Sequence, residues 1–347
     1  GLWTSWTKKR DENDPLVKKY GLKQMQFGFR PVQLKPGQTE AEAIDEKVKE
    51  FKDLVARYPH TKRALIFHES GGGAYPWELV GGQTKPTAEQ WAAASNLVQT
   101  AVRTAKAWRK AAPDVKLVWG NTVDSLPLLA NVYRLKVPRD LIDFTGEETV
   151  GCMTPPEYST ARAPWMQKKL AQVMGYGDIP VDCPFEWKTR VVRNLWDPDR
   201  QLPDYHMRDG LIALALGYSM VPTPVGPDVS NGYVDSVWGS GDSHIRYPLA
   251  YPRRTSPAVA TMTDIMDRAK LVSLLPTGSL TVYAPQFAVK GGASYATAVW
   301  CARGETKVKL DLGENADYEL VTLTGHRTKG AKELEIPATE SPRYVHT

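Results

Sequence analysis

Two glutamates, Glu69 and Glu186, each come shortly after an apolar segment with the composition of a buried strand. Glu69 follows the segment 63–67 (RALIF) and precedes three consecutive glycines, and Glu186 follows the segment 179–185 (IPVDCPF). Glycoside hydrolysis needs two carboxyl groups, one that protonates the leaving oxygen and one that attacks the anomeric carbon or activates water. The two glutamates suit this chemistry if the fold brings the ends of both segments together.

Several residues beside these glutamates have side chains that can hold a sugar. His68 and Trp77 flank Glu69, and Trp187 follows Glu186, where an apolar neighbour would desolvate the carboxyl group and raise its pKa. Weaker candidates follow other apolar segments or lie in expected loops, with a purely structural role as the alternative for each: Arg30, Asn121, Asp124, Tyr205, His206 and Trp238. Glu147 and Glu148 are rivals for the catalytic role, although adjacent carboxylates cannot both point into one site.

The elements that must position these residues alternate between strands and helices. Near-continuous apolar segments, typical of parallel strands buried on both faces, occupy 25–29, 63–67, 115–120, 141–146, 179–185 and 218–224. Helical patterns cover about 39–58, 87–112, 124–134, 163–175, 207–216 and 257–273. Thr39 with Glu42, and Thr87 with Gln90, form capping boxes, and Ser256 is the expected N-cap of the last helix. This alternation predicts a doubly wound sheet or a (β/α)₈ barrel.

The pattern changes after about residue 276, where short strands separated by turns indicate an antiparallel module. We therefore expect a barrel domain over 1–274 and a C-terminal β-sandwich over 275–347. A barrel needs eight strands, and we interpret the six apolar segments as its third to eighth. The first two β/α units are expected from a second polypeptide, from an upstream fragment, or from residues that precede this sequence. Carboxylates at the carboxyl ends of barrel strands share one rim, which places Glu69 and Glu186 together.

The composition argues against several classes of protein. The longest apolar stretch falls short of 18 uninterrupted residues, so neither a membrane span nor a membrane partner is expected. The net charge of +5 comes from scattered residues without basic, aromatic-rich runs, which argues against nucleic acid. The three cysteines form no CxxC pair, and we expect buried thiols, with a Cys152–Cys183 disulfide as the alternative. Neither a metal nor a cofactor is expected, because a reaction carried by two carboxyl groups needs none. The GxSxG, HExxH and P-loop motifs of other enzyme classes are absent.

Two stretches resemble the clan A glycoside hydrolases, which are retaining (β/α)₈-barrel enzymes. Residues 16–31 (LVKKYGLKQMQFGFRP) resemble their second helix and third strand. Residues from 251–272 (YPRRTSPAVATMTDIMDRAKLV) to the closing SPRYV resemble their eighth helix and a C-terminal β-sandwich like that of family 39. The His68-Glu69 pair is instead similar to family 26, so the resemblance identifies the clan and leaves the family open.

The resemblance implies roles for individual residues. Clan A enzymes carry the acid/base after the fourth strand and the nucleophile after the seventh, which correspond here to Glu69 and Glu186. The position of Glu147, after the sixth strand, usually binds substrate in the clan. Many clan A families have Asn where this chain has His68, and in them that Asn contacts the sugar 2-hydroxyl.

The sequence therefore predicts a retaining glycoside hydrolase that cleaves β-glycosidic bonds in an oligo- or polysaccharide. A secreted or periplasmic location follows from that substrate class alone. A catalytically inactive, glycan-binding barrel is the alternative, because His68 departs from the commonest motif. A metal-dependent barrel enzyme would need several His and Asp residues at strand ends, and His68 is the one histidine there.

Overall fold

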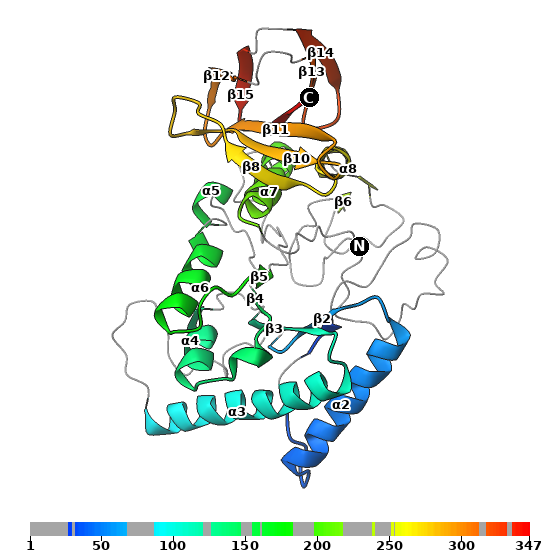
Figure 1. Cartoon of the computed structure of the whole chain (residues 1–347), viewed down its shortest axis with the longest axis vertical. Helices are drawn as coiled ribbons and strands as arrows, with labels where there is room; N and C mark the ends of the chain where they lie inside the picture. Colours follow the sequence, from blue (N-terminus) through cyan, green and yellow to red (C-terminus); the bar gives the residue numbers. More distant parts are fainter. Residues whose placement is uncertain are drawn as a thin grey trace. The chain divides into compact units, whose positions relative to one another are not determined.

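The structure of the chain, a computed structural model, describes residues 27–29, 32–67, 87–120, 126–146, 155–159, 162–182, 198–217, 238–239, 251–252, 254–311, 317–331 and 335–347. The chain divides into two compact units (Figure 1). The first contains residues 1–149 and 163–184, and the second contains residues 150–162 and 185–347. The two units are described separately below.

A parallel sheet forms the centre of the first unit. Its strands lie side by side in chain order: β1 (Phe27–Gly28), β2 (Arg63–Leu65), β3 (Lys116–Gly120), β4 (Phe144–Gly146) and β5 (Val181–Asp182). Each lies within one of the first five predicted segments, which confirms that these segments are parallel neighbours. The sixth predicted segment, 218–224, lies outside the described residues. Because the strands are parallel, all five carboxyl ends face the same edge of the sheet.

Helices follow the strands of this unit as the sequence predicts: α2 (Glu40–Arg57), α3 (Ala88–Ala111), α4 (Leu126–Arg134) and α6 (Arg162–Val173). A short 3₁₀ helix that the sequence does not predict, η3 (Arg139–Leu141), precedes β4. Both predicted capping boxes are present. Thr39 Oγ1 accepts from the backbone N–H of Glu42 and Thr87 Oγ1 from that of Gln90, and each partner's side chain accepts from the threonine's own backbone N–H. These reciprocal bonds fix where α2 and α3 begin.

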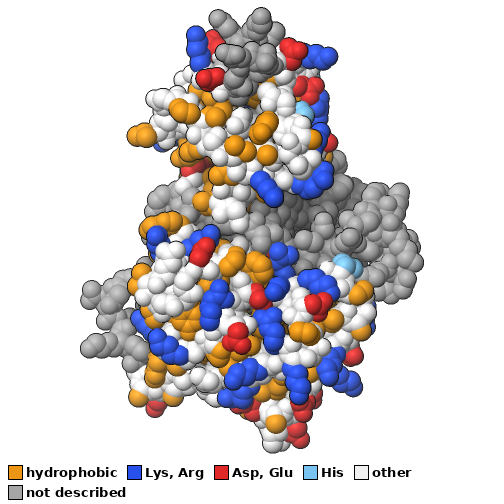
Figure 2. Space-filling model, in the orientation of Figure 1, with side chains coloured by type: hydrophobic (Ala, Val, Ile, Leu, Met, Phe, Trp, Pro, Cys, Tyr) orange, Lys and Arg blue, Asp and Glu red, His pale blue; other side chains and the backbone are white. Residues whose placement is uncertain are grey.

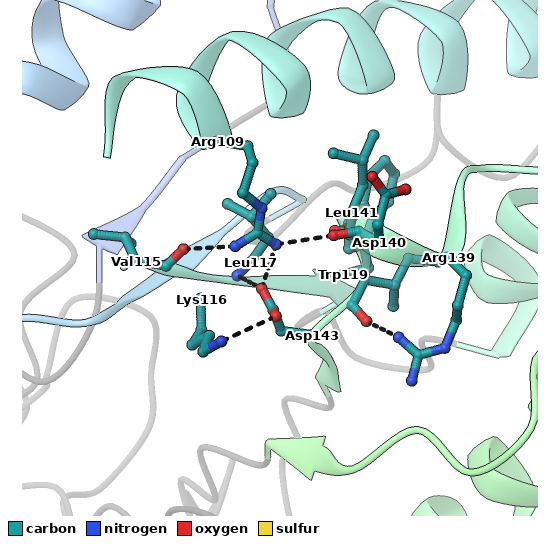
Figure 3. Close-up of polar contacts among 10 residues, drawn as sticks. Arg109, Val115, Lys116, Leu117, Trp119, Arg139, Asp140, Leu141 and Asp143 are labelled. Atoms are coloured by element: carbon teal, nitrogen blue, oxygen red, sulfur yellow. Dashed lines mark hydrogen bonds and ion pairs between the residues drawn. The ribbon is translucent and has the colours of Figure 1, made fainter. Parts of the chain in front are cut away.

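The amino-terminal edge of the sheet is held by a group of polar contacts around Asp143, just before β4 (Figure 3). Asp143 Oδ2 accepts from the backbone N–H of Leu117 at 2.8 Å and from the Arg109 guanidinium at 2.5 Å. Arg109 also donates to the backbone oxygens of Val115 and Asp140. Arg109 therefore ties α3 to the beginnings of β3 and β4, at the edge opposite the strands' carboxyl ends.

The second unit combines helices with antiparallel strands. The helices are α5 (Pro156–Ser159), α7 (Pro198–Ala215) and α8 (Thr255–Ile265). A seven-stranded sheet contains β8 (Lys270–Leu274), β9 (Val282–Tyr283), β10 (Pro285–Val289), β11 (Ser294–Cys301), β13 (Asp317–Val321), β14 (Arg327–Ala331) and β16 (Arg343–His346). Two further pairs are β12 (Glu305–Lys309) with β15 (Glu335–Thr339), and β6 (Trp238–Gly239) with β7 (Tyr251–Pro252).

The seven-stranded sheet has an apolar core on each face. One core joins side chains such as Phe287 and Trp300 to Met207 of α7 and Met262 of α8. The other contains apolar side chains of β9, β11 and β16 together with those of β12 and β15: Val282, Val299, Val345, Val308, Ile336 and Ala338. The antiparallel module predicted after residue 276 is thus present, packed on helices on one side and on a strand pair on the other.

Three predicted helix boundaries are wrong. The last helix ends at Ile265 instead of residue 273, because residues 270–274 form β8 and pair with β10. Its N-cap is Arg254, so Ser256 lies inside the helix and does not cap it. Helix α7 begins at Pro198, nine residues before the predicted start at 207. The proline inside that helix, Pro203, lacks the N–H of a helix interior and explains why the earlier start was not predicted.

The described part of the chain contains no helix that is both long enough and apolar enough to cross a membrane. On the face shown in Figure 2, Lys and Arg side chains are interspersed with Asp and Glu.

Candidate functional site

The predicted site lies beyond the carboxyl ends of the parallel strands, where the described chain stops at Phe29, Phe67, Gly120, Gly146 and Asp182. Most of the predicted site residues come just after these points and lie outside the described residues: Arg30, His68, Glu69, Trp77, Asn121, Asp124, Glu147, Glu148, Glu186 and Trp187. The structure therefore describes the strands that lead to these residues.

The strand register separates two faces of the sheet. Phe27, Ala64 and Leu117 are partners across neighbouring strands and point to one face, where they join the core formed with the helices. Leu65 and Val118 are partners on the other face of the sheet. Both are buried, but neither belongs to the core that packs against the helices. The second face is therefore a separate, inner face of the sheet.

Two charged residues meet on the inner face, Arg63 at the beginning of β2 and Asp182 at the end of β5. Arg63 Nε lies 2.9 Å from Asp182 Oδ2, and the Asp182 side chain is fully buried while 23% of the Arg63 side chain is exposed. The Arg63 guanidinium carbon also lies 5.4 Å from the centre of the Phe144 ring on β4. The two contacts join β2 to β4 and β5, strands that are not its neighbours in the sheet.

This contact requires the sheet to curve. In a flat sheet β2 and β5 would lie three strand spacings apart, about 14 Å, with their side chains perpendicular to the sheet. Two side chains in that arrangement could not approach to 2.9 Å. The inner face is therefore concave, and Arg63 and Asp182 close the distance across it.

The strands are also oblique to the direction of curvature. Across the sheet, Asp182 pairs with Gly146, and Gly146 pairs with Gly120. Continued to the chain of β2, the same register places residue 67 opposite Gly120. Arg63 lies four positions before residue 67, yet it is the residue that contacts Asp182. Strand tilt of this kind accompanies the curvature of closed parallel sheets.

Sequence reasoning missed Arg63 and Asp182. Each is a charged residue inside an otherwise apolar strand segment, RALIF or IPVDCPF. A charge within a buried strand needs a partner of opposite sign, so the two segments together carried the signal.

Three of the weaker candidates belong to the second unit. Tyr205 and His206 lie in helix α7 and not in a loop as predicted. The Tyr205 ring faces the Arg208 guanidinium, whose carbon lies 5.0 Å from the ring centre, and burial raises the pKa of the Tyr205 hydroxyl. Burial lowers the pKa of His206 to about 4, and 4% of this residue is exposed. Trp238 begins the short strand β6.

The described residues contain no cluster of three or more His, Cys, Asp or Glu arranged to hold a metal ion. Cys301 is a buried free thiol that lies 3.0 Å from the backbone oxygen of Arg303, as predicted for the cysteines in general. Cys152 and Cys183 lie outside the described residues, so the disulfide alternative stays a prediction.

The solved structures to which this chain is similar include glycoside hydrolases. A GH51 α-L-arabinofuranosidase from Thermotoga petrophila has a TM-score of 0.58 and 16% identity, over 95% of this chain and 77% of that one. A GH39 β-xylosidase from Caulobacter crescentus has a TM-score of 0.56 and 13% identity, over 95% and 80%. A GH86 enzyme in complex with neoagarooctaose has a TM-score of 0.61 and 10% identity, over 98% and 63%.

No protein-family model matches the chain, and no curated protein matches its sequence. The structural likeness extends over almost the whole chain and includes GH39, whose C-terminal module the sequence resembles. It confirms the sequence resemblance to clan A at the level of the fold. The chain therefore has the fold that these clan A glycoside hydrolases share.

Proposed function

We propose that the chain is a retaining glycoside hydrolase that cleaves β-glycosidic bonds of an oligo- or polysaccharide, with Glu186 as nucleophile and Glu69 as general acid/base. The observation that carries this proposal is the contact between Arg63 and Asp182, because it joins the strand before Glu69 to the strand before Glu186. The fold shared with glycoside hydrolases supports the same class of reaction.

The spacing of the two glutamates is the same relative to their strands. Glu69 follows Leu65, the last residue of β2, by four positions, and Glu186 follows Asp182, the last residue of β5, by four positions. By the strand register, the side chains of Leu65 and Asp182 both point to the inner face of the sheet. In our proposal β1 to β5 are the third to seventh strands of a (β/α)₈ barrel, which matches the acid/base and nucleophile positions of clan A.

The proposed reaction has two steps. In the first, the Glu186 carboxylate attacks the anomeric carbon, the glycosidic bond breaks, and the Glu69 carboxylic acid gives its proton to the departing oxygen. In the second, the Glu69 carboxylate takes a proton from water, and the resulting hydroxyl oxygen displaces Glu186 from the anomeric carbon. The sugar leaves with its original configuration, and Glu69 is protonated again.

Most of the remaining predicted residues have binding roles in this proposal. Next to the acid/base, His68 would contact the sugar, and Glu147 would bind substrate from its position after β4. The aromatic and polar candidates would form platforms and hydrogen bonds around the sugar: Arg30, Trp77, Asn121, Trp187, Tyr205 and Trp238. His206 is buried inside α7 and has no binding role in this proposal. A carbohydrate is the proposed partner, and a secreted or periplasmic location fits it.

The test is a screen of the wild type against aryl-glycosides and polysaccharides, followed by the same screen of Glu186→Ala. We expect wild-type turnover on at least one substrate and none in Glu186→Ala, because the covalent intermediate cannot form. If the wild type binds a glycan on the panel but hydrolyses none, the chain is the glycan-binding barrel instead.

A further inference from the structure

Among the ion pairs of the described residues, the pair of Arg63 and Asp182 combines a fully buried carboxylate with partners from two strands that are not neighbours in the sheet. A carboxylate removed from water is costly unless a cation compensates it. We propose that Arg63 and Asp182 are positioning residues, which hold the strand before Glu69 and the strand before Glu186 at the separation that catalysis needs. This inference rests on the proposed function.

The contact is suited to that role by its position. Asp182 is the last residue of β5, and the Arg63 guanidinium reaches it across the concave inner face of the sheet. Glu69 lies six positions after Arg63, and Glu186 lies four positions after Asp182. The Asp182 side chain is fully buried and Arg63 begins β2, so we infer that both act through the strands that carry the glutamates.

The separation of two catalytic carboxyl groups is a sensitive quantity. Retaining enzymes hold them about 5–5.5 Å apart, and inverting enzymes hold them about 6.5–9.5 Å apart. A displacement of about 1 Å in a reacting group can cost roughly 100-fold in rate. A contact that joins the two supporting strands inside the sheet therefore bears directly on the rate of the chemical step.

The other contacts of Arg63 strengthen its hold on this position. Its guanidinium carbon lies 5.4 Å from the centre of the Phe144 ring of β4. A lysine at this position would keep the charge but not the planar guanidinium. Val118 and Leu65 fill the same inner face without exposure to solvent. Among the described residues, the pair therefore lies on the same face of the sheet as buried apolar side chains.

The experiment compares kcat and KM of Arg63→Met, Asp182→Asn and the double variant with those of the wild type. We expect each single variant to lower kcat about 10- to 100-fold with KM changed by less than about threefold, because positioning acts on the transition state. We expect the double variant to lose no more than the worse single variant, since residues that act as a unit are not additive. Arg63→Lys should recover part of kcat.

Arg109→Met is the matched control. Arg109 also pairs with an aspartate, Asp143, within the first unit, but it does so at the amino-terminal edge of the sheet (Figure 3). Its variant should lower the melting temperature and leave kcat within about twofold of the wild type, below its melting transition. A fall in kcat equal to that of Arg63→Met would overturn the positioning role, because general destabilisation would then explain both.

The outcomes separate this inference from the proposed function. If Glu186→Ala is inactive while Arg63→Met retains wild-type kcat, the positioning role is wrong and the proposed function stands. If the wild type has no hydrolytic activity on any substrate, the proposed function is wrong and the inference falls with it. Unfolding experiments on the same four proteins measure the coupling of the pair directly, and strictly additive destabilisation would contradict the contact itself.

Discussion

Arg208 and Glu157 form a bidentate ion pair inside the second unit, with Arg208 fully buried and 8% of the Glu157 side chain exposed. Arg208 Nε lies 2.7 Å from Glu157 Oε1, and a terminal guanidinium nitrogen lies 2.6 Å from Oε2. The indole N–H of Trp300 donates to the same Oε1 at 2.7 Å. These contacts join α5 and α7 to strand β11 and hold the three elements together inside the second unit.

We predict that Arg208→Met destabilises the protein by about 3–5 kcal/mol, because it leaves the Glu157 carboxylate buried without its cation. Differential scanning calorimetry against the wild type measures the change. Arg268→Met is the control, since Arg268 pairs with Asp267 on the surface and 68% of its side chain is exposed. A loss in Arg208→Met no larger than in the control would show that the buried pair adds little.

We predict that His206 makes the folded protein sensitive to acid. Its pKa is lowered by burial to about 4, against 6.5 for an ordinary histidine, so the unfolded chain binds the proton first. Stability from this group is therefore complete above about pH 6.5, falls as the pH decreases towards 4, and the loss totals roughly 3 kcal/mol. His206→Leu should remove this part of the pH dependence.

Urea unfolding at several pH values between 4 and 7 measures the effect as the difference between wild type and variant. His326→Leu, at an exposed position between β13 and β14, is the control for loss of a histidine in general. Parallel curves for the wild type and His206→Leu would rule out His206 as the source of acid sensitivity.

We predict an asymmetric response of the two glutamates. Glu69→Ala should retain the first step on aryl-glycosides with good leaving groups, which need little protonation, while substrates with poor leaving groups fail. Azide should then restore turnover by attacking the glycosyl-enzyme, and the product should be a glycosyl azide. Steady-state kinetics across a series of leaving groups tests this. Equal rates for good and poor leaving groups in Glu69→Ala would show that Glu69 is not the acid.

We predict that the carboxyl groups of Glu69 and Glu186 lie about 5–5.5 Å apart, the range of retaining enzymes. A crystal structure measures the distance, and proton NMR of the first product formed reports the configuration of the anomeric carbon. Retention should be observed. A first product of inverted configuration, or a separation of about 6.5–9.5 Å, would instead assign Glu186 as the base that activates water.

Local signals predicted much of the architecture. Thr39 and Thr87 mark the beginnings of α2 and α3 because capping boxes are determined by residues three positions apart. Runs of buried apolar residues located β1 to β5. The helical pattern extends over residues 270–273, which belong to β8, because a short apolar segment is ambiguous in isolation and only pairing with β10 makes it a strand.

The interior of the candidate site was harder to predict than the strands. Arg63 and Asp182 are far apart in sequence, and the register alone would place Asp182 level with residue 67. Their meeting depends on the curvature and tilt of the sheet, which no local pattern encodes. The catalytic assignment of Glu69 and Glu186 stays a prediction, because both lie outside the described residues.

The path of the chain between the two units has a consequence for how the protein can be divided. Residues 150–162, including α5 and the buried Glu157, belong with the C-terminal portion, although residues 163–184, with most of α6 and β5, belong with the amino-terminal portion. Cutting the chain at any single peptide bond therefore leaves at least one unit without a part of its own structure. Exchange of modules with a relative would need three coordinated junctions, so the two units are expected to be inherited together.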